Sequence, residues 1–310
     1  MRKVVLALGV TLALAACEWR LDPAAAARAT CLDESAEAQA RTEACSTLID
    51  TGELEGGERA AAFANRGAAI YEAGDVTAAL RDYNMALQAD ENTMLAVLGK
   101  ATILIESGQL DAAAPLVRRL VESGEHEANA HYLAGVIAQQ RGDNGAAADA
   151  FTASINADRR FAPSYAQRGA LKQRQEDYAG AIEDYDRAIA LNGQLATALA
   201  GRCWSRVLME DGDIGAARRD GDAAASADPR CVQGQLCRGL LQLRAGEWAG
   251  ARVSYEAALA VEPGNPTALF GRGVARRRSG DNAGREDMNQ ARDFDDRVAR
   301  RFDDLGVETY

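Results

Sequence analysis

Small, aromatic and polar residues recur along the chain with a period of about 34 residues from residue 60 onward. One clear copy contains Gly67, Gly74, Asp75, Ala79, Tyr83 and Ala86. Three further copies keep the same register, with Gly135, Gly142, Asp143, Ala147 and Phe151; with Gly169, Asp177, Ala181, Tyr185 and Ala188; and with Gly239, Gly246, Ala251, Tyr255 and Ala258. A period of this length indicates a stack of similar supersecondary units rather than one globular core.

Within each period the spacing predicts two helices joined by a tight turn. Ala79, Tyr83 and Ala86 are separated by four and three residues, so they fall on one face of a helix. The Gly74-Asp75 pair ahead of them is typical of a turn. Glycine can end the first helix in a left-handed conformation, and aspartate can cap the second helix. Each period is therefore expected to form an antiparallel hairpin whose apolar face is covered by the next hairpin.

We divide this part of the chain into seven repeats: 60–93, 94–127, 128–161, 162–197, 198–231, 232–265 and 266–299. The second repeat lacks the aromatic residue. The fifth carries two extra residues and has Gly221 in place of the aromatic, which predicts a local packing gap. The seventh has a polar second helix, with Arg285 and Asn289 at apolar positions, as a terminal cap requires.

This pattern resembles the tetratricopeptide repeat family, in which helical hairpins of 34 residues follow one another. Pro229 and Pro263 also stand one period apart, at the family's proline position near the end of the repeat. The resemblance implies an all-α fold, a right-handed superhelical solenoid of hairpins. It also implies binding of a protein or peptide partner in the concave groove that the first helices line.

The family's groove positions on the first helix fall on polar and aromatic residues of this chain: Asn65, Asn129, Tyr132, Gln139, Gln167, Gln173, Arg174, Arg202, Arg206, Gln233, Arg244, Phe270, Arg277 and Arg278. Arg202 and Arg206 are four residues apart and share a helix face. With Arg244 and Arg277 they predict a basic strip suited to an acidic segment or a C-terminal carboxylate. The alternative is a solvated polar face without a ligand.

The N-terminus predicts export. Arg2 and Lys3 precede an uncharged run, Val4 to Ala16, that is too short to span a bilayer but fits a secretory signal over residues 1–16. The run ends in Leu14-Ala15-Ala16-Cys17, which resembles the lipobox of bacterial lipoproteins. That resemblance implies lipidation of Cys17 by a diacylglycerol carrying fatty acids such as palmitate. The alternative is an ordinary signal peptide in which Cys17 has no role.

The segments outside the repeats receive three assignments. Residues 17–30 are expected to form the lipidated cysteine and a tether, 31–59 an N-terminal capping helix, and 300–310 a C-terminal tail. A disulfide between Cys31 and Cys45 would close a loop of about 15 residues, worth ~3 kcal/mol in the chain-entropy model. Cys203 and Cys237 are 34 residues apart on consecutive first helices. The usual separation of about 8–10 Å between such helices is wide for a disulfide, so we favour buried thiols, with a Cys203–Cys237 bond as the alternative.

Composition narrows the function classes. Removal of residues 1–16 leaves 33 basic and 46 acidic residues, a formal charge of −13, which argues against nucleic-acid binding. The sequence contains two histidines and none of the common catalytic, phosphate-binding or metal-binding motifs, so we expect no enzyme activity, cofactor or metal.

The sequence therefore predicts a non-catalytic scaffold or adaptor of the bacterial cell envelope. It would face the periplasm through a lipid anchor, with the outer membrane favoured by Glu18, and bind a protein or peptide partner. A soluble periplasmic protein is the alternative location. A self-associating structural subunit and a solenoid that binds glycans or small ligands are the alternative functions.

Overall fold

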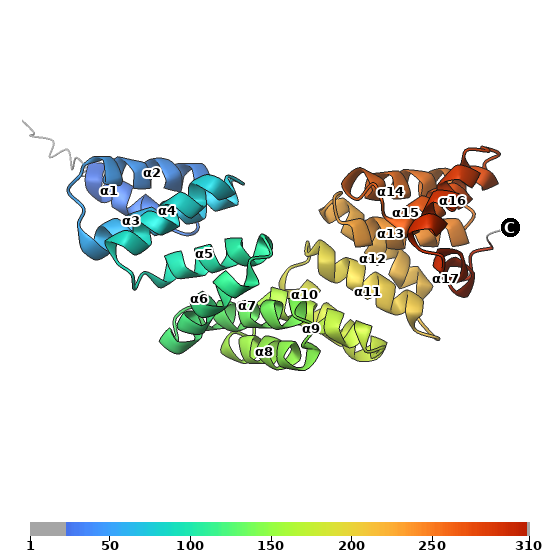
Figure 1. The fold of residues 1–310 in the computed structure, drawn as a ribbon, viewed down its shortest axis with the longest axis horizontal. Coiled ribbons are helices and arrows are strands. Elements are labelled where there is room, and N and C mark those ends of the chain that lie inside the picture. Colours follow the sequence, from blue (N-terminus) through green and yellow to red (C-terminus); the bar gives the residue numbers. More distant parts are fainter. Residues whose placement is uncertain (1–22, 309–310) are drawn as a thin grey trace, which may run out of the picture. The chain divides into compact units, whose positions relative to one another are not determined.

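The computed structural model describes residues 23–308, and every regular element in that range is an α-helix (Figure 1). The expected all-α fold of successive helical hairpins is confirmed. The signal and Cys17 lie outside the described residues. The helices are α1 Pro23–Leu32, α2 Ala38–Asp50, α3 Gly56–Glu72, α4 Val76–Ala89, α5 Met94–Glu106, α6 Leu110–Ser123, α7 Glu127–Gln140, α8 Asn144–Ala157, α9 Ala162–Arg174, α10 Tyr178–Leu191, α11 Ala196–Leu208, α12 Ile214–Ala227, α13 Val232–Arg244, α14 Trp248–Val261, α15 Pro266–Arg278, α16 Gly284–Phe294 and α17 Val298–Asp304.

The chain divides into two compact units, residues 1–103 and 104–310. The first contains α1 to α4 and most of α5, and the second contains α6 to α17. In both units each odd-numbered helix from α3 to α15 is the first helix of a repeat, and the following even-numbered helix is the second.

The turns inside the hairpins have the conformation that the sequence predicts. Gly74 and Gly142 have φ values of 92° and 83°, in the left-handed region where glycine is favoured. Asp75, Asp143, Asp177 and Asp213 each accept a hydrogen bond from a backbone N–H in the first turn of the following helix. These aspartates are therefore helix caps.

In three repeats an aromatic residue lies between two glycines on consecutive first helices. Tyr185 of α10 contacts Gly169 of α9 and Gly201 of α11, each 16 residues away in the sequence. Tyr83 has the same relation to Gly67 and Gly99, and Tyr255 to Gly239 and Gly271. A Cβ atom at Gly201 would overlap the Tyr185 ring. The rings are buried because both neighbouring helices lack side chains at these positions.

The fifth repeat breaks this pattern, and here the expected packing gap is wrong. Gly221 replaces the aromatic, but a Cβ there would meet the Cys203 sulfur at 3.2 Å and the Arg238 nitrogen at 3.3 Å. Cys203 and Cys237 are disulfide-bonded, with Cα atoms 6.5 Å apart, and fill the space. The expectation of buried thiols fails because the usual separation of about 8–10 Å refers to helix axes, whereas Cα atoms on facing sides of two helices lie closer together, here within reach of a disulfide.

A second recurring contact joins the two helices within a repeat. Arg168 of α9 donates two hydrogen bonds to Asp184 of α10, at 2.9 and 2.7 Å. The same paired contact joins Arg66 to Asp82, Arg202 to Asp220, and Arg272 to Asp287. We call these four pairs the arginine–aspartate clamps. The aspartates are at most 6% exposed. Burial of an unpaired carboxylate has a high free-energy cost, and the two hydrogen bonds from the charged arginine offset it.

Both ends of the repeat array differ from the sequence-based assignment. Residues assigned to the tether form α1, which packs on α2 and is joined to it by a disulfide between Cys31 and Cys45, with Cα atoms 4.8 Å apart. At the other end, residues expected to be a free tail form most of α17 and pack on α15 and α16 (Figure 1). Phe302 is the reason, because its buried ring lies 5.0 Å from the ring of Phe270.

The glycine–aromatic packing leads to a first prediction. Replacement of Gly201 by Ala should destabilise the protein by about 1–3 kcal/mol, because the new methyl group has to displace the Tyr185 ring. Gly193→Ala is the matched control, since a Cβ there meets nothing closer than 3.9 Å. Chemical denaturation followed by circular dichroism measures both variants. Equal denaturation midpoints for the Gly201→Ala and Gly193→Ala proteins would show that the Tyr185 ring does not require glycine at residue 201.

Candidate peptide-binding groove

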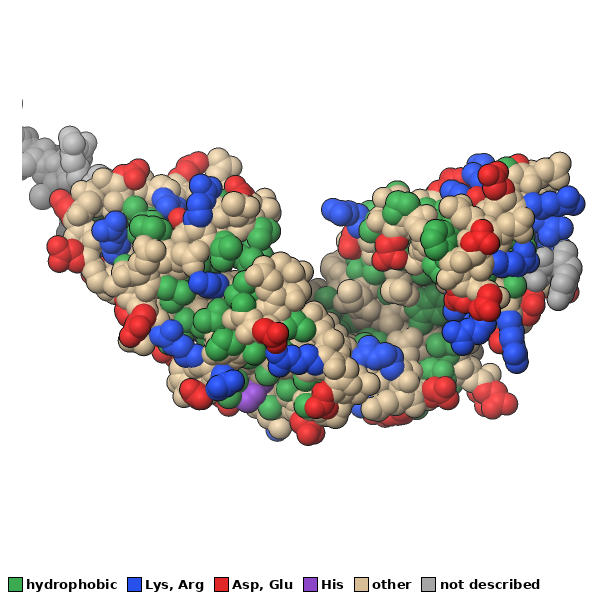
Figure 2. All heavy atoms as spheres, viewed as in Figure 1, with side chains coloured by type: hydrophobic (Ala, Val, Ile, Leu, Met, Phe, Trp, Pro, Cys, Tyr) green, Lys and Arg blue, Asp and Glu red, His purple; other side chains and the backbone are tan. Residues whose placement is uncertain are grey.

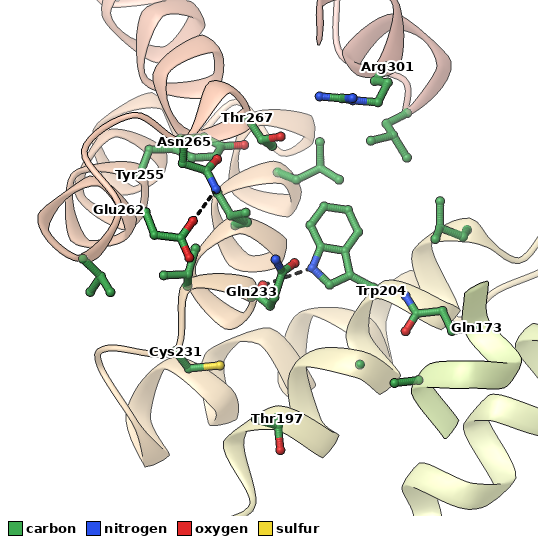
Figure 3. Close-up of a pocket in the computed structure, with 18 of the residues that line it drawn as sticks. Gln173, Thr197, Trp204, Cys231, Gln233, Tyr255, Glu262, Asn265, Thr267 and Arg301 are labelled. Atoms are coloured by element: carbon green, nitrogen blue, oxygen red, sulfur yellow. Dashed lines mark hydrogen bonds between the residues drawn. The ribbon is translucent and has the colours of Figure 1, made fainter. Parts of the chain in front are cut away.

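A cavity of about 950 Å³ opens in the unit of residues 104–310 (Figure 3). Its walls come from the first helices α9, α11 and α13, from the loops that precede α13 and α15, and from α17. We call this cavity the groove. First helices supply most of the lining because their consecutive faces lie next to one another in the stack of repeats.

The floor of the groove is apolar. Trp204, Leu208, Leu236, Leu240 and Val261 contribute to it. Leu208 and Val261 are 39% and 38% exposed, high values for large aliphatic side chains. The Trp204 indole stands in the groove, and its Nε1 donates a hydrogen bond to the backbone oxygen of Gln233 at 3.0 Å (Figure 3). This bond joins α11 to α13 across the floor.

The rim of the groove is polar. Arg174 at the end of α9 and Arg230 before α13 are exposed, and neither side chain forms an ion pair within residues 23–308. Farther along, Asn265 donates a hydrogen bond to Glu262 at 2.8 Å. Apolar floor and adaptable polar rim together are the composition typical of a site for another protein chain.

Helix α17 forms the wall at the C-terminal end. Arg301 lies at the groove (Figure 3), and Leu305, directly after the helix, also lines it. Arg301 forms an ion pair with Asp295 at 2.6 Å. Phe302 of the same helix packs 6.4 Å from the Tyr255 ring. Burial raises the pKa of Tyr255 well above the usual tyrosine range, and its hydroxyl has no hydrogen-bond partner within the described chain.

Two other titratable groups lie along the groove. The hydroxyl of Tyr185 donates a hydrogen bond to the Gln173 side chain at 3.0 Å, and burial raises the pKa of Tyr185 above its usual range. Burial also raises the pKa of the Cys231 thiol. Cys231 is therefore mostly protonated at neutral pH and a poor nucleophile. No cluster of three or more metal-ligating side chains occurs in residues 23–308.

The structure places few of the sequence-predicted groove residues in this cavity. Arg174 lines it, as do Gln173 and Gln233. Arg244 and Arg277 are exposed but do not line it. Asn65 belongs to the other unit, where its side chain is 9% exposed and donates to the backbone of Ala61.

Arg202 and Arg206 are not groove residues, which corrects the predicted basic strip. Both contact Asp220, and their side chains are only 17% and 18% exposed. The reason is the register of the fifth repeat. Its first helix begins at Ala196, two residues before the predicted start, and the two extra residues lie in the turn between α11 and α12. Every groove position on α11 is therefore shifted by two residues.

The aromatic candidates are also buried in packing contacts. Phe270 is fully buried beneath Phe302 because α17 covers it. The Tyr132 ring packs against Phe151 and Phe161, with centroids 5.9 and 5.5 Å away. Asn129 and Gln167 are partly buried and lie outside the groove, where Gln167 hydrogen-bonds Tyr132.

Sequence reasoning missed Thr197, Trp204 and Leu208, although the signal was present. Counted from Ala196, they occupy the second, ninth and thirteenth positions of the first helix, all of which are groove positions in the family pattern. A correct placement of the two-residue insertion would have found them. The contribution of Arg301 has no such signal, because it depends on the docking of α17.

Charge on the visible face of the described chain is mixed. Figure 2 shows acidic and basic side chains interspersed, without a continuous basic surface on that face. Six arginines contact the clamp aspartates inside the repeats, namely Arg66, Arg168, Arg202, Arg206, Arg272 and Arg276. No helix among residues 23–308 is long and apolar enough to cross a membrane.

The clamp at Asp220 yields a second prediction. Arg206→Glu should lower the free energy of unfolding by about 1–3 kcal/mol, because it sets a second carboxylate beside a buried one. Arg174→Glu, on the exposed rim, should change it by no more than about 0.5 kcal/mol. Denaturant titrations of both proteins measure the difference. If Arg206→Glu unfolds together with Arg174→Glu, Arg206 is a surface residue after all.

Comparison with known proteins agrees with this architecture. One model of the tetratricopeptide repeat matches residues 98–166, 204–255 and 238–287, and a second model of the same repeat matches residues 162–195. Together these matches cover more than half of the chain. Both models describe the repeat itself and neither describes a catalytic domain. No curated protein matches the sequence.

Several solved structures are similar in fold. A chain of the APC/C hetero-tetramer Cut9–Hcn1 has a TM-score of 0.63 at 13% identity, over 92% of this chain and 56% of that one. PilF of Pseudomonas aeruginosa has a TM-score of 0.55 at 16% identity, over 65% and 89%. A tetratricopeptide repeat protein of Parabacteroides merdae has a TM-score of 0.50 at 15% identity, over 79% and 98%.

At these identities the likeness concerns the fold alone, and this chain spans only about half of the Cut9–Hcn1 chain. The family matches go further, because they rest on the residue pattern of the repeats themselves. Hairpins, caps and glycine–aromatic packing in the structure follow the same pattern. The chain belongs to the tetratricopeptide repeat family, whose members are protein–protein interaction scaffolds.

Proposed function

We propose that this protein is a non-catalytic adaptor of the bacterial cell envelope that holds a peptide segment of a partner protein in the groove between α9 and α17. The observation that carries the proposal is the groove itself. It combines an exposed apolar floor with rim arginines that have no ion-pair partner in the described chain.

Physical considerations favour a peptide over a glycan. A peptide can place an apolar side chain against Trp204 and Leu208 while its backbone or a carboxylate reaches Arg174 and Arg230. A glycan would require exposed rings for stacking. Of the aromatic groove residues, Trp204 is only partly exposed, and Tyr185, Tyr255 and Phe302 are buried.

Envelope location is the part of the proposal that rests on the sequence. The Leu-Ala-Ala-Cys run after a short apolar segment supports export and lipidation of Cys17. With a formal charge of −13 after removal of residues 1–16, the protein would be held on an anionic membrane by its acyl chains rather than by its surface charge.

The anchor can be tested by one substitution. Cys17→Ser removes the thiol that would be acylated, so the protein should be released from the membrane fraction or accumulate as an unprocessed precursor. Fractionation and immunoblotting measure this, with a Cys231→Ser variant as a control for loss of an unrelated thiol. Membrane association of Cys17→Ser equal to that of the wild type would contradict the proposal.

The groove can be tested by site-specific photo-crosslinking in cells. A crosslinking amino acid at Leu208 should capture the partner. The same probe at Val253, which is 55% exposed on α14 outside the groove, should not.

The captured partner is then purified and its affinity measured for Leu208→Asp and for the matched surface variant Val253→Asp. Leu208→Asp should weaken binding by about tenfold or more, because a charge enters the apolar floor, whereas Val253→Asp should bind like the wild type. Capture from Val253 alone, or equal affinities for both variants, would place the binding site outside the groove.

A further inference from the structure

The fifth repeat replaces all three parts of the glycine–aromatic–glycine contact at once. In three other repeats a tyrosine packs between glycines on consecutive first helices, as Tyr185 does between Gly169 and Gly201. At the corresponding positions of the fifth repeat the outer residues are Cys203 and Cys237, and the central residue is Gly221. Compared with the other three repeats, the second helix here lacks a side chain at the central position, and the two first helices carry side chains where the others have glycine.

The structure shows what this exchange accomplishes. Cys203 of α11 and Cys237 of α13 are disulfide-bonded, and both are fully buried. The bond lies over Gly221, where an added Cβ would meet the Cys203 sulfur at 3.2 Å. A ring at residue 221 and a disulfide above it therefore exclude each other. The bond occupies the place of the ring and joins the same two helices.

The groove lies at this junction. Trp204 follows Cys203 directly and Leu236 precedes Cys237, and both line the groove floor. The indole of Trp204 bonds the backbone of Gln233 on α13, so the floor depends on the spacing of α11 and α13. Without the bond, neither a ring nor a covalent link would set that spacing.

We propose that the Cys203–Cys237 disulfide is a covalent substitute for the missing aromatic ring. In this proposal α11 and α13 take up the spacing on which the groove floor depends only when the bond has formed. The proposal concerns the folding of the groove and does not depend on what binds there. It implies that the groove is completed by oxidation in a compartment where disulfides form.

The chemistry needs an oxidant, which we identify as the disulfide of a thiol–disulfide exchange protein. One cysteine thiolate attacks a sulfur of that disulfide and releases a thiolate, forming a mixed disulfide. The second cysteine thiolate then displaces the oxidant as a dithiol. In total the two cysteines lose two protons and two electrons, and the oxidant gains them. The raised pKa of Cys231 disfavours its thiolate as a competitor in this exchange.

Three variants separate this proposal from an incidental bond. Cys203→Ala with Cys237→Ala removes the link and leaves small side chains. Cys203→Gly, Gly221→Tyr and Cys237→Gly together restore the glycine–tyrosine–glycine contact of the other repeats. Cys31→Ala with Cys45→Ala removes the other disulfide, which lies in the other unit, and serves as the control.

Amide hydrogen exchange measured by mass spectrometry on each full-length mature protein provides the readout. Amides of α11 to α13 should exchange on the order of tenfold faster, or more, in the double alanine variant, since a long closed loop is released. The triple variant should return to nearly wild-type protection in the same helices. The control variant should leave their exchange unchanged.

Wild-type exchange rates in the double alanine variant would overturn the proposal, as would a folded triple variant that stays as unprotected as the double one. Non-reducing peptide mapping of the exported wild-type protein provides a test that needs no variant to fold. A linked Cys203–Cys237 peptide is expected. Recovery of both as alkylated thiols, or of either one linked to Cys231, would refute the substitution of a ring by this bond.

Discussion

The structure depends on the close approach of consecutive first helices, which a single inserted ring controls. Tyr83, Tyr185 and Tyr255 can lie between their neighbours only because glycine stands on both sides of each ring. The contact links three helices at once, so it fixes both the hairpin and its position on the next one. Stability in such an array is the sum of these neighbour contacts, and one poor junction weakens the stack locally. The disulfide above Gly221 meets the same requirement with a different chemistry.

The arginine–aspartate clamps act alongside this packing and explain where the positive charge of the protein is placed. Each clamp joins the two helices of a repeat through a nearly buried aspartate. In three repeats a second cation, Lys172, Arg206 or Arg276, also contacts that aspartate. Arg202 and Arg206, which look like part of a recognition surface in the sequence, are therefore structural. The cations left for a ligand are those at helix ends and in loops, such as Arg174 and Arg230.

The groove follows from these two constraints and from the docking of α17. First helices that lie close together expose a continuous face, and the apolar residues on it remain accessible where no element covers them. Farther toward the C-terminus α17 covers the same face, so Phe270 is buried there by Phe302, while Leu208 is exposed and Trp204 partly exposed. The boundary of the groove is thus set by the chain's own last helix.

The sequence by itself determined the repeat, because spacing in a regular helix decides which residues share a face. The turn glycines, the capping aspartates and the aromatic position of each repeat could all be predicted in this way. The register of α11 could not, since two inserted residues can be placed in a helix or in the following turn with little difference in local preference. Only the tertiary structure assigned Arg202 and Arg206 to a clamp, brought Cys203 and Cys237 together, and placed α17 along the groove. Each of these depends on distances between helices, which local spacing does not encode.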